Sequence, residues 1–192
     1  SLSANATGSA NVAIGPVALA SNTTGLHNIA IGDLASNANT TGYENIALGN
    51  QALQLNTIGY ANISLGGASM QNNLSGVRNI GIGYYALYGN TEGYDNIGIG
   101  HWAFGGPCTG AGNIGMGTGT LNAITTGSNN TAIGSGCLAS LTTGSLNFAQ
   151  GMSSMSKNTT GWNNIAIGQE ALKENTTGEG NIALGKYALV GS

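Results

Sequence analysis

The stretch NIAIGQEAL at residues 164–172, followed by NTTG at 175–178, decides the fold because it recurs along nearly the whole chain. Its opening Asn falls eleven times, every 17 residues and without insertion or deletion, at 11, 28, 45, 62, 79, 96, 113, 130, 147, 164 and 181. A fixed short period is the signature of a repeat architecture, in which each copy stacks on its neighbours. We therefore number the columns of the repeat from this Asn and treat residues 1–192 as one repeat domain.

Three columns are invariant. Column 1 is Asn in all eleven copies, and columns 5 and 15 are Gly in all eleven, which accounts for 22 of the 34 glycines. Glycine at a fixed offset predicts a backbone corner with positive φ, which glycine adopts without steric cost. We expect the Asn side chains to hydrogen-bond from coil to coil. These structural ladders include Asn28, Asn45 and Asn164 in column 1 and Gly32, Gly49 and Gly168 in column 5.

Large and small residues alternate between the corners. Columns 2 and 4 are almost always Ile, Val, Leu or Met, and column 3 is only Ala, Ser or Gly. This pattern predicts a short strand with columns 2 and 4 inside and column 3 outside. Columns 8 and 9, mostly Ala and Leu, predict a second strand. A helix is excluded because each turn would carry two or more glycines, at about 1 kcal/mol each. The predicted fold is all-β: a parallel β-solenoid of eleven 17-residue coils.

The composition excludes some classes of partner and favours association between copies of the chain. Charged residues make up only 6% of the chain and the net charge is −3, with no basic block, so a nucleic-acid partner is not expected. No apolar run approaches the ~18 residues of a membrane span, so membrane insertion is not expected either. A coil this narrow buries little, and the small residues of column 3 would let another chain approach closely. We therefore expect two-fold or three-fold association along the rod.

The string Asn-Ile-Ala-Ile-Gly-x-x-Ala-Leu, spaced by Asn-Thr-Thr-Gly, resembles the YadA-like head repeats of trimeric autotransporter adhesins. It also resembles the repeat arrays of phage and virus tail-fibre proteins. The best copies lie at 22–35, 39–52, 158–171 and 175–188. The resemblance implies a left-handed β-roll, three chains around one axis, and attachment to surfaces from a cell or virion. The period of 17 exceeds the usual autotransporter repeat. Because the chain starts mid-repeat, we expect a segment of a longer fibrous protein or a unit that stacks end to end.

Catalytic chemistry has few residues to work with. The chain holds two His and two Asp, and His27 and His101 lie in different columns about four coils apart. Cys108 and Cys137 lie two coils apart in different columns, too far for a disulfide, whose Cα atoms lie within about 7 Å. We expect no enzyme activity, no metal site and no cofactor. The Asn-Thr-Thr sequences are glycosylation sequons, but their turn position already explains them.

Specificity is expected in the variable outward columns, which turn aromatic in the middle of the chain. Exposed aromatic side chains beside polar groups suit a sugar face or a protein patch, although they could equally pack on a neighbouring chain. In the solenoid, Tyr84 should stack near His101 and Tyr85 near Trp102. The candidate ligand-binding residues are Tyr84, Tyr85, Tyr88, Tyr94, His101 and Trp102.

A second candidate contact surface lies in column 12. Usually Asn, it becomes Pro107, Ile124 and Leu141 in three successive coils, which predicts a local contact edge between subunits.

The leading functional hypothesis is a structural and attachment module: a rigid extracellular rod, on a cell surface or virion, that binds a surface glycan or protein receptor. An ice-binding solenoid is an alternative, because columns 13 and 14 stack Thr pairs such as Thr23/Thr24 and Thr176/Thr177. Three features weigh against it: adjacent residues of an extended chain point to opposite sides, the pair runs directly into a Gly corner, and some copies break the array. An end-to-end filament subunit is the third hypothesis.

Overall fold

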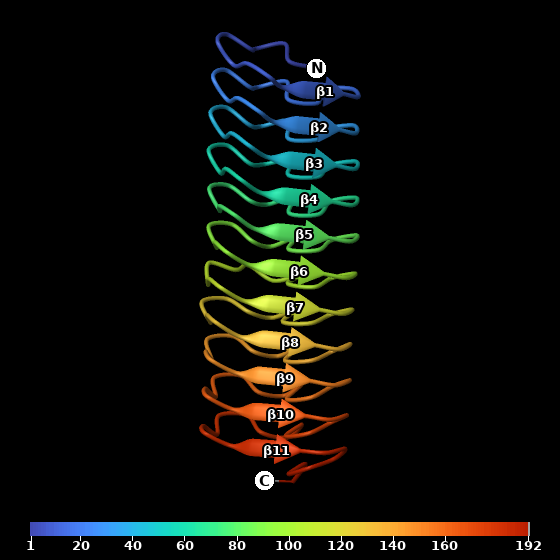
Figure 1. The fold of residues 1–192 in the computed structure, drawn as a ribbon, viewed down its shortest axis with the longest axis vertical. Coiled ribbons are helices and arrows are strands. Elements are labelled where there is room, and N and C mark those ends of the chain that lie inside the picture. The colour runs from blue at the N-terminus through green and yellow to red at the C-terminus, as the bar shows by residue number, and fades with distance from the viewer. Residues whose placement is uncertain (192) are drawn as a thin grey trace.

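The chain is a single straight stack of coils, each contributing one short parallel strand to one continuous sheet (Figure 1). The computed structural model describes residues 1–191. No helix is present in this range. The strands follow sequence order, so each pairs only with the coil before and the coil after it. Their bounds are β1 Val12–Ile14, β2 Ile29–Ile31, β3 Ile46–Leu48, β4 Ile63–Leu65, β5 Ile80–Ile82, β6 Ile97–Ile99, β7 Ile114–Met116, β8 Thr131–Ile133, β9 Phe148–Gln150, β10 Ile165–Ile167 and β11 Ile182–Leu184.

The register is the sequence period itself, which confirms the parallel β-solenoid and its 17-residue coil. Ala13 pairs with Ala30 and Ala30 with Ala47, and the same offset holds through β11. Outside the strands the backbone also bonds from coil to coil, as where Leu19 N donates to the Ala35 carbonyl at 3.1 Å. At the usual strand spacing of about 4.8 Å, eleven coils make a rod about 50 Å tall.

The inside and outside of the strand are the reverse of the prediction. Column 3 is buried in nearly every coil, whereas columns 2 and 4 are half-buried or exposed in every coil. The interior holds little more than a single layer of side chains, in which column 3 faces the column 8 and 9 residues. Phe104 of column 9 illustrates the lack of room: a Cβ on Gly115 would lie 2.7 Å from its ring. Large Ile side chains therefore cannot point inward and are turned out.

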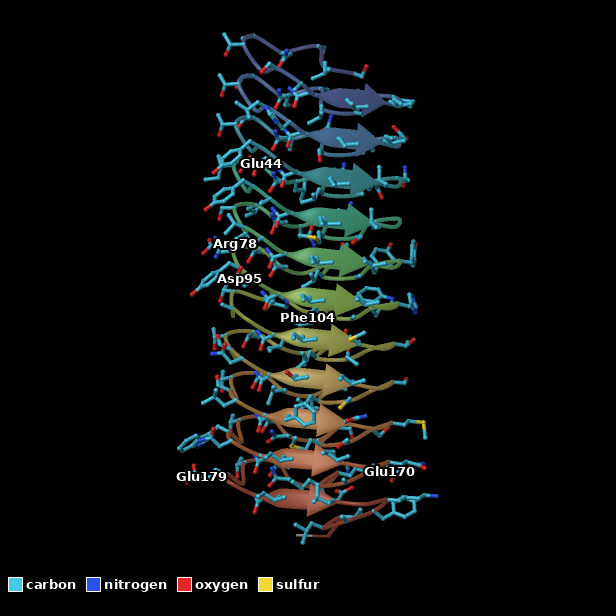
Figure 2. The ribbon with its side chains drawn as sticks, in the orientation of Figure 1. Glu44, Arg78, Asp95, Phe104, Glu170 and Glu179 are labelled. Carbon is cyan, nitrogen blue, oxygen red and sulfur yellow. The ribbon has the colours of Figure 1, made fainter. Side chains whose placement is uncertain are left out.

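Three successive coils place Gly in column 3 opposite the column 9 side chain of the preceding coil. The pairs are Met70 with Gly81, Leu87 with Gly98 and Phe104 with Gly115, whereas Met155 faces Ala166. Phe104 packs against Gly115, and a Cβ on Gly81 would lie 2.8 Å from the Met70 side chain. These column 9 side chains are fully buried. The label of Phe104 in Figure 2 lies between β6 and β7, at the height of this widened part of the core.

The second predicted strand does not form. Columns 7 and 9 adopt positive φ in nearly every coil, as at Val17 (48°) and Leu19 (49°). A strand requires negative φ throughout and sends successive side chains to opposite faces. The left-handed residue instead curls the chain, so that Ala18 and Leu19 both point into the core with no exposure. Columns 6–11 are therefore a chain of turns.

Two buried Asn ladders run along the rod, which confirms the predicted role of column 1. Asn45 is buried, and its side chain bonds only to protein atoms. Its Nδ2 donates to Asn28 Oδ1 at 3.1 Å and to the Gly59 carbonyl at 2.9 Å. Its backbone N also donates to Asn28 Oδ1, at 3.1 Å. Asn164 repeats this arrangement one coil after another Asn of the same column. Column 12 forms the second ladder, in which Asn56 Nδ2 donates to the same Gly59 carbonyl.

The two glycine columns have different causes. Column 5 has the predicted positive φ, with 139° at Gly32, 137° at Gly49 and 133° at Gly168. Column 15 does not, so the prediction of a positive φ was wrong there. Its cause is close packing: a Cβ on Gly42 would overlap both the Asn39 Oδ1 and the carbonyl oxygen of the next glycine in the column.

The apolar residues of column 12 do not form a contact edge as predicted. Ile124 and Leu141 are fully buried and take the places of ladder Asn side chains inside the coil. Pro107 is exposed, and the neighbouring Cys108 is buried in its stead. Apolar side chains fit this column because the interior position itself is enclosed, and only the hydrogen bonds of the second Asn ladder are lost.

Candidate functional site

One side of the rod presents two parallel rows of large apolar side chains, and we call this surface the apolar face. It consists of columns 2 and 4 of β1–β11, broken only by Thr131 and Gln150. Its side chains are half-buried to exposed in the middle of the rod, with 36% at Ile82 and 41% at Met116, and more exposed in the first and last strands, with 58% at Ile14 and 65% at Leu184. No charged residue belongs to it along the whole sheet. Such a continuous apolar surface marks an interaction site more often than a solvated wall.

Sequence reasoning found the residues of the apolar face but placed them in the core. A large–small–large triplet has the same appearance whether its large residues face in or out. The available signal was the size of column 3: only a very narrow interior restricts one column to Ala, Ser and Gly in all copies. The contact surface between chains was therefore expected on column 3, and the structure places the exposed strip on columns 2 and 4 instead.

Five of the six predicted ligand-binding residues form one aromatic cluster in the turns after β5 and β6. Tyr85 stacks on Trp102 with ring centroids 4.6 Å apart, and Tyr84 stacks on His101 at 5.9 Å, as predicted. Tyr88 closes the cluster edge-on to Tyr85 at 5.0 Å. The pKa of Tyr85 is raised, first by a hydrogen bond with the Tyr84 side chain. We call these residues the aromatic cluster.

Tyr94 lies elsewhere. Columns 6 and 7 follow the strand and columns 16 and 17 precede it, so the two pairs of columns occupy opposite edges of the sheet. Figure 2 shows this separation, with Glu170 at the edge after the strands and Asp95 at the edge before them. Tyr94 is adjacent to Asp95 in the chain and is 48% exposed. It therefore contributes nothing to the aromatic cluster.

The edge that carries Tyr94 has its own pairs, which sequence reasoning missed. Tyr43 and Tyr60 of column 16 stack with centroids 4.7 Å apart and an interplanar angle of 3°. Arg78 binds Asp95 of the next coil through two hydrogen bonds of 2.7 and 2.8 Å, and this lowers the pKa of the Asp95 carboxyl. Equal column numbers in successive coils were the signal for both pairs.

Neither cysteine is positioned for redox or nucleophilic chemistry. Cys108 and Cys137 are free and fully buried. Desolvation raises their pKa values to about 11 and about 12, so the thiols stay protonated. Within residues 1–191, no group of three or more His, Cys, Asp or Glu side chains could hold a metal ion. The same range contains no helix of the length and apolarity that crossing a membrane would need.

The Thr columns do not form a two-column array of free hydroxyls. Column 13 hydroxyls donate to backbone carbonyls one coil on, as from Thr23 to Thr40 at 3.0 Å and from Thr142 to Thr159 at 2.9 Å. Column 14 is exposed in most coils, but a single column of free hydroxyls does not favour the ice-binding alternative. The sequon residue Asn39 is buried, and its Nδ2 is hydrogen-bonded to Asn22 and Gly42. The folded coil therefore does not present this amide for glycosylation.

Comparison with known proteins adds no constraint on function. No protein-family model, curated protein or solved structure matches the chain. The class that the fold defines is a single-sheet parallel β-solenoid with 17-residue coils, an exposed apolar face and an aromatic cluster on one edge.

Proposed function

We propose that this chain is the rigid head of an extracellular attachment fibre, on a cell surface or virion, and that it assembles as a homotrimer through its apolar face. The observation that carries the proposal is the apolar face itself. It projects to about 500 Å², from a width of about 10 Å and a height of about 50 Å. This is at the upper end of the largest apolar patches that monomeric proteins expose, and it is continuous.

Copies of the same chain are the partner that fits this face best. Another copy presents an apolar surface of equal length and the same spacing at every coil, so parallel copies match along the entire rod. A cyclic arrangement turns each apolar face toward a common axis and leaves the variable columns outside. Three chains accord with the resemblance of the repeats to YadA-like heads and tail-fibre arrays. The variable columns then project outward, where a receptor can reach them.

The assembly is tested by light scattering on the purified chain at several concentrations. A constant mass near three times 19.0 kDa supports the trimer. A mass of 19.0 kDa at all concentrations overturns it, and growth without limit indicates a filament instead.

Attachment is tested with beads coated with the chain and washed over lawns of bacterial, algal and animal cells. Retention above that of beads coated with an unrelated β-solenoid is expected on at least one lawn. Equal retention on all of them contradicts the attachment role.

A further inference from the structure

The aromatic cluster ends abruptly on the side facing the C-terminus. Column 7 carries Tyr85 and Trp102 in successive coils and then Gly119 and Gly136 in the next two. Tyr85 covers one face of the Trp102 indole at 4.6 Å. A Cβ built on Gly119 would meet no atom within 4 Å, so no side chain follows Trp102 in column 7 of the next coil. The aromatic stack of column 7 therefore stops at Trp102, and the next position, Gly119, has no side chain.

The spacing of the coils suits a planar ring stacked on Trp102. Coils repeat at about 4.8 Å, close to the spacing of the Tyr85–Trp102 stack. A ring stacked on the face of Trp102 away from Tyr85 would therefore lie at the height of Gly119, where the chain has no side chain. Column 7 is Gly in the following coil as well, where the Ser153 hydroxyl lies 3.5 Å from the position of a Cβ built on Gly136. We call the exposed surface formed by Trp102, Gly119 and Gly136 the Trp102 shelf.

Polar groups line the shelf without being used elsewhere. Asn122 reaches the indole, because both side chains approach the point where a Cβ of Gly105 would stand. Within residues 1–191 the Asn122 side chain makes no hydrogen bond, so its amide can both donate and accept. Thr118 and Ser135 of column 6 immediately precede Gly119 and Gly136 in the chain, so each adds a hydroxyl next to these glycines. From residue 84 to residue 153, columns 6, 7 and 10 hold no charged side chain.

We propose that the Trp102 shelf binds a neutral pyranose residue of a surface glycan. A pyranose has an apolar C–H face and a rim of hydroxyls, which matches an indole face bordered by amide and hydroxyl groups. The sugar ring takes the place of the missing side chain at Gly119, and Asn122 and Thr118 bond its hydroxyls. The absence of charge selects neutral over sialylated or sulfated sugars. This inference rests on the proposed attachment function and specifies its receptor.

The test is an array of neutral and acidic glycans probed with the native oligomer and two variants. Trp102→Ala removes the platform, and Gly119→Tyr fills the ligand position with a protein ring. Column 7 already holds Tyr85 and Trp102 at φ 56°, close to 65° at Gly119, so the added Tyr fits the backbone. Each variant is expected to lose about tenfold or more in affinity for the neutral glycan, the usual loss for one stacked ring.

The matched controls are Tyr94→Ala, an exposed aromatic at the opposite edge, and Gln51→Tyr, the same added ring in column 7 of a distant coil. Both are expected to bind as the native chain does, with unchanged mass and melting temperature. Native-like glycan binding by both shelf variants overturns the proposal. So does a fall in oligomer mass for Trp102→Ala, because the aromatic cluster would then pack between subunits. A silent array with beads that still adhere refutes the shelf alone, whereas loss of all adhesion refutes the attachment function.

Discussion

Replacing Ile82 by Asp tests the apolar face directly. Ile82 lies in β5, near the middle of the rod, and its side chain is turned outward and 36% exposed. At about 25 cal/mol/Å², burying about 500 Å² per chain contributes about 12 kcal/mol per chain before the costs of association. Three carboxylates at one height would each lose several kcal/mol of solvation. We expect this loss to exceed the surplus and to give monomers at micromolar concentration and neutral pH.

The same substitution should leave each chain folded, because the side chain lies outside the coil and the hydrogen bonds of β5 are made by the backbone. A cost of no more than about 1 kcal/mol is expected for placing Asp in a strand. Protonation restores the trimer as the pH falls, since burial raises the carboxyl pKa in the assembly and favours the neutral form. Light scattering and circular dichroism from pH 7 to pH 4 follow both changes. Thr41→Asp, on the exposed column 14, is the control with equal charge. A trimer that persists for Ile82→Asp at pH 7 would refute the assignment of the interface.

Four further predictions concern the coil itself; the three substitutions are measured by thermal and denaturant unfolding, and the two cysteines by thiol labelling and by unfolding as a function of pH. Asn62→Leu in column 1 should cost about 3 kcal/mol or more, because the Asn79 backbone N–H loses its acceptor in the core. Asn56→Leu in column 12 should cost less, about 1–2 kcal/mol, since that ladder joins side chains to each other and to Gly59, which keeps a second donor; equal costs would contradict the difference between the ladders. Gly42→Ala should destabilise by several kcal/mol, since its Cβ overlaps backbone and ladder atoms; a neutral effect would show that the coils separate easily. Cys108 and Cys137 should react with thiol reagents at pH 8 only after denaturation, and the free energy of unfolding should fall as the pH rises above 9.0, because the thiols then ionise only in the unfolded chain; rapid labelling of the native chain would disprove their burial.

Most of the fold could be predicted from the 17-residue period of the sequence. Equal spacing fixed the coil, the parallel register and the column 1 ladder, because side chains of one column must meet at each turn. The same rule placed Tyr84 on His101 and Tyr85 on Trp102.

What the period does not fix is the direction of each column. Columns 2 and 4 are apolar both in a core and in an interface, so Ile82 reads the same in either. Positive φ at residues such as Leu19 follows from the closure of a narrow coil. The amino acids in column 9 do not predict it, because Leu rarely adopts positive φ. The position of Tyr94 could have been predicted from the sequence, because column 16 precedes the strand and column 6 follows it. Tyr94 and Trp102 are both exposed, but exposure does not place two side chains on the same edge of the sheet.

Because each coil contacts only the coils next to it, the height of the rod is set by the number of repeats. Duplication or loss of one 17-residue unit changes the height by about 4.8 Å and leaves every other pairing intact. Because all eleven repeats have the same length, the gain or loss of repeats changes the height of the rod in whole steps. A gain of units before residue 79 would carry the Trp102 shelf farther from the N-terminal end, with its chemistry unaltered. The length of the rod can thus change without altering the aromatic cluster.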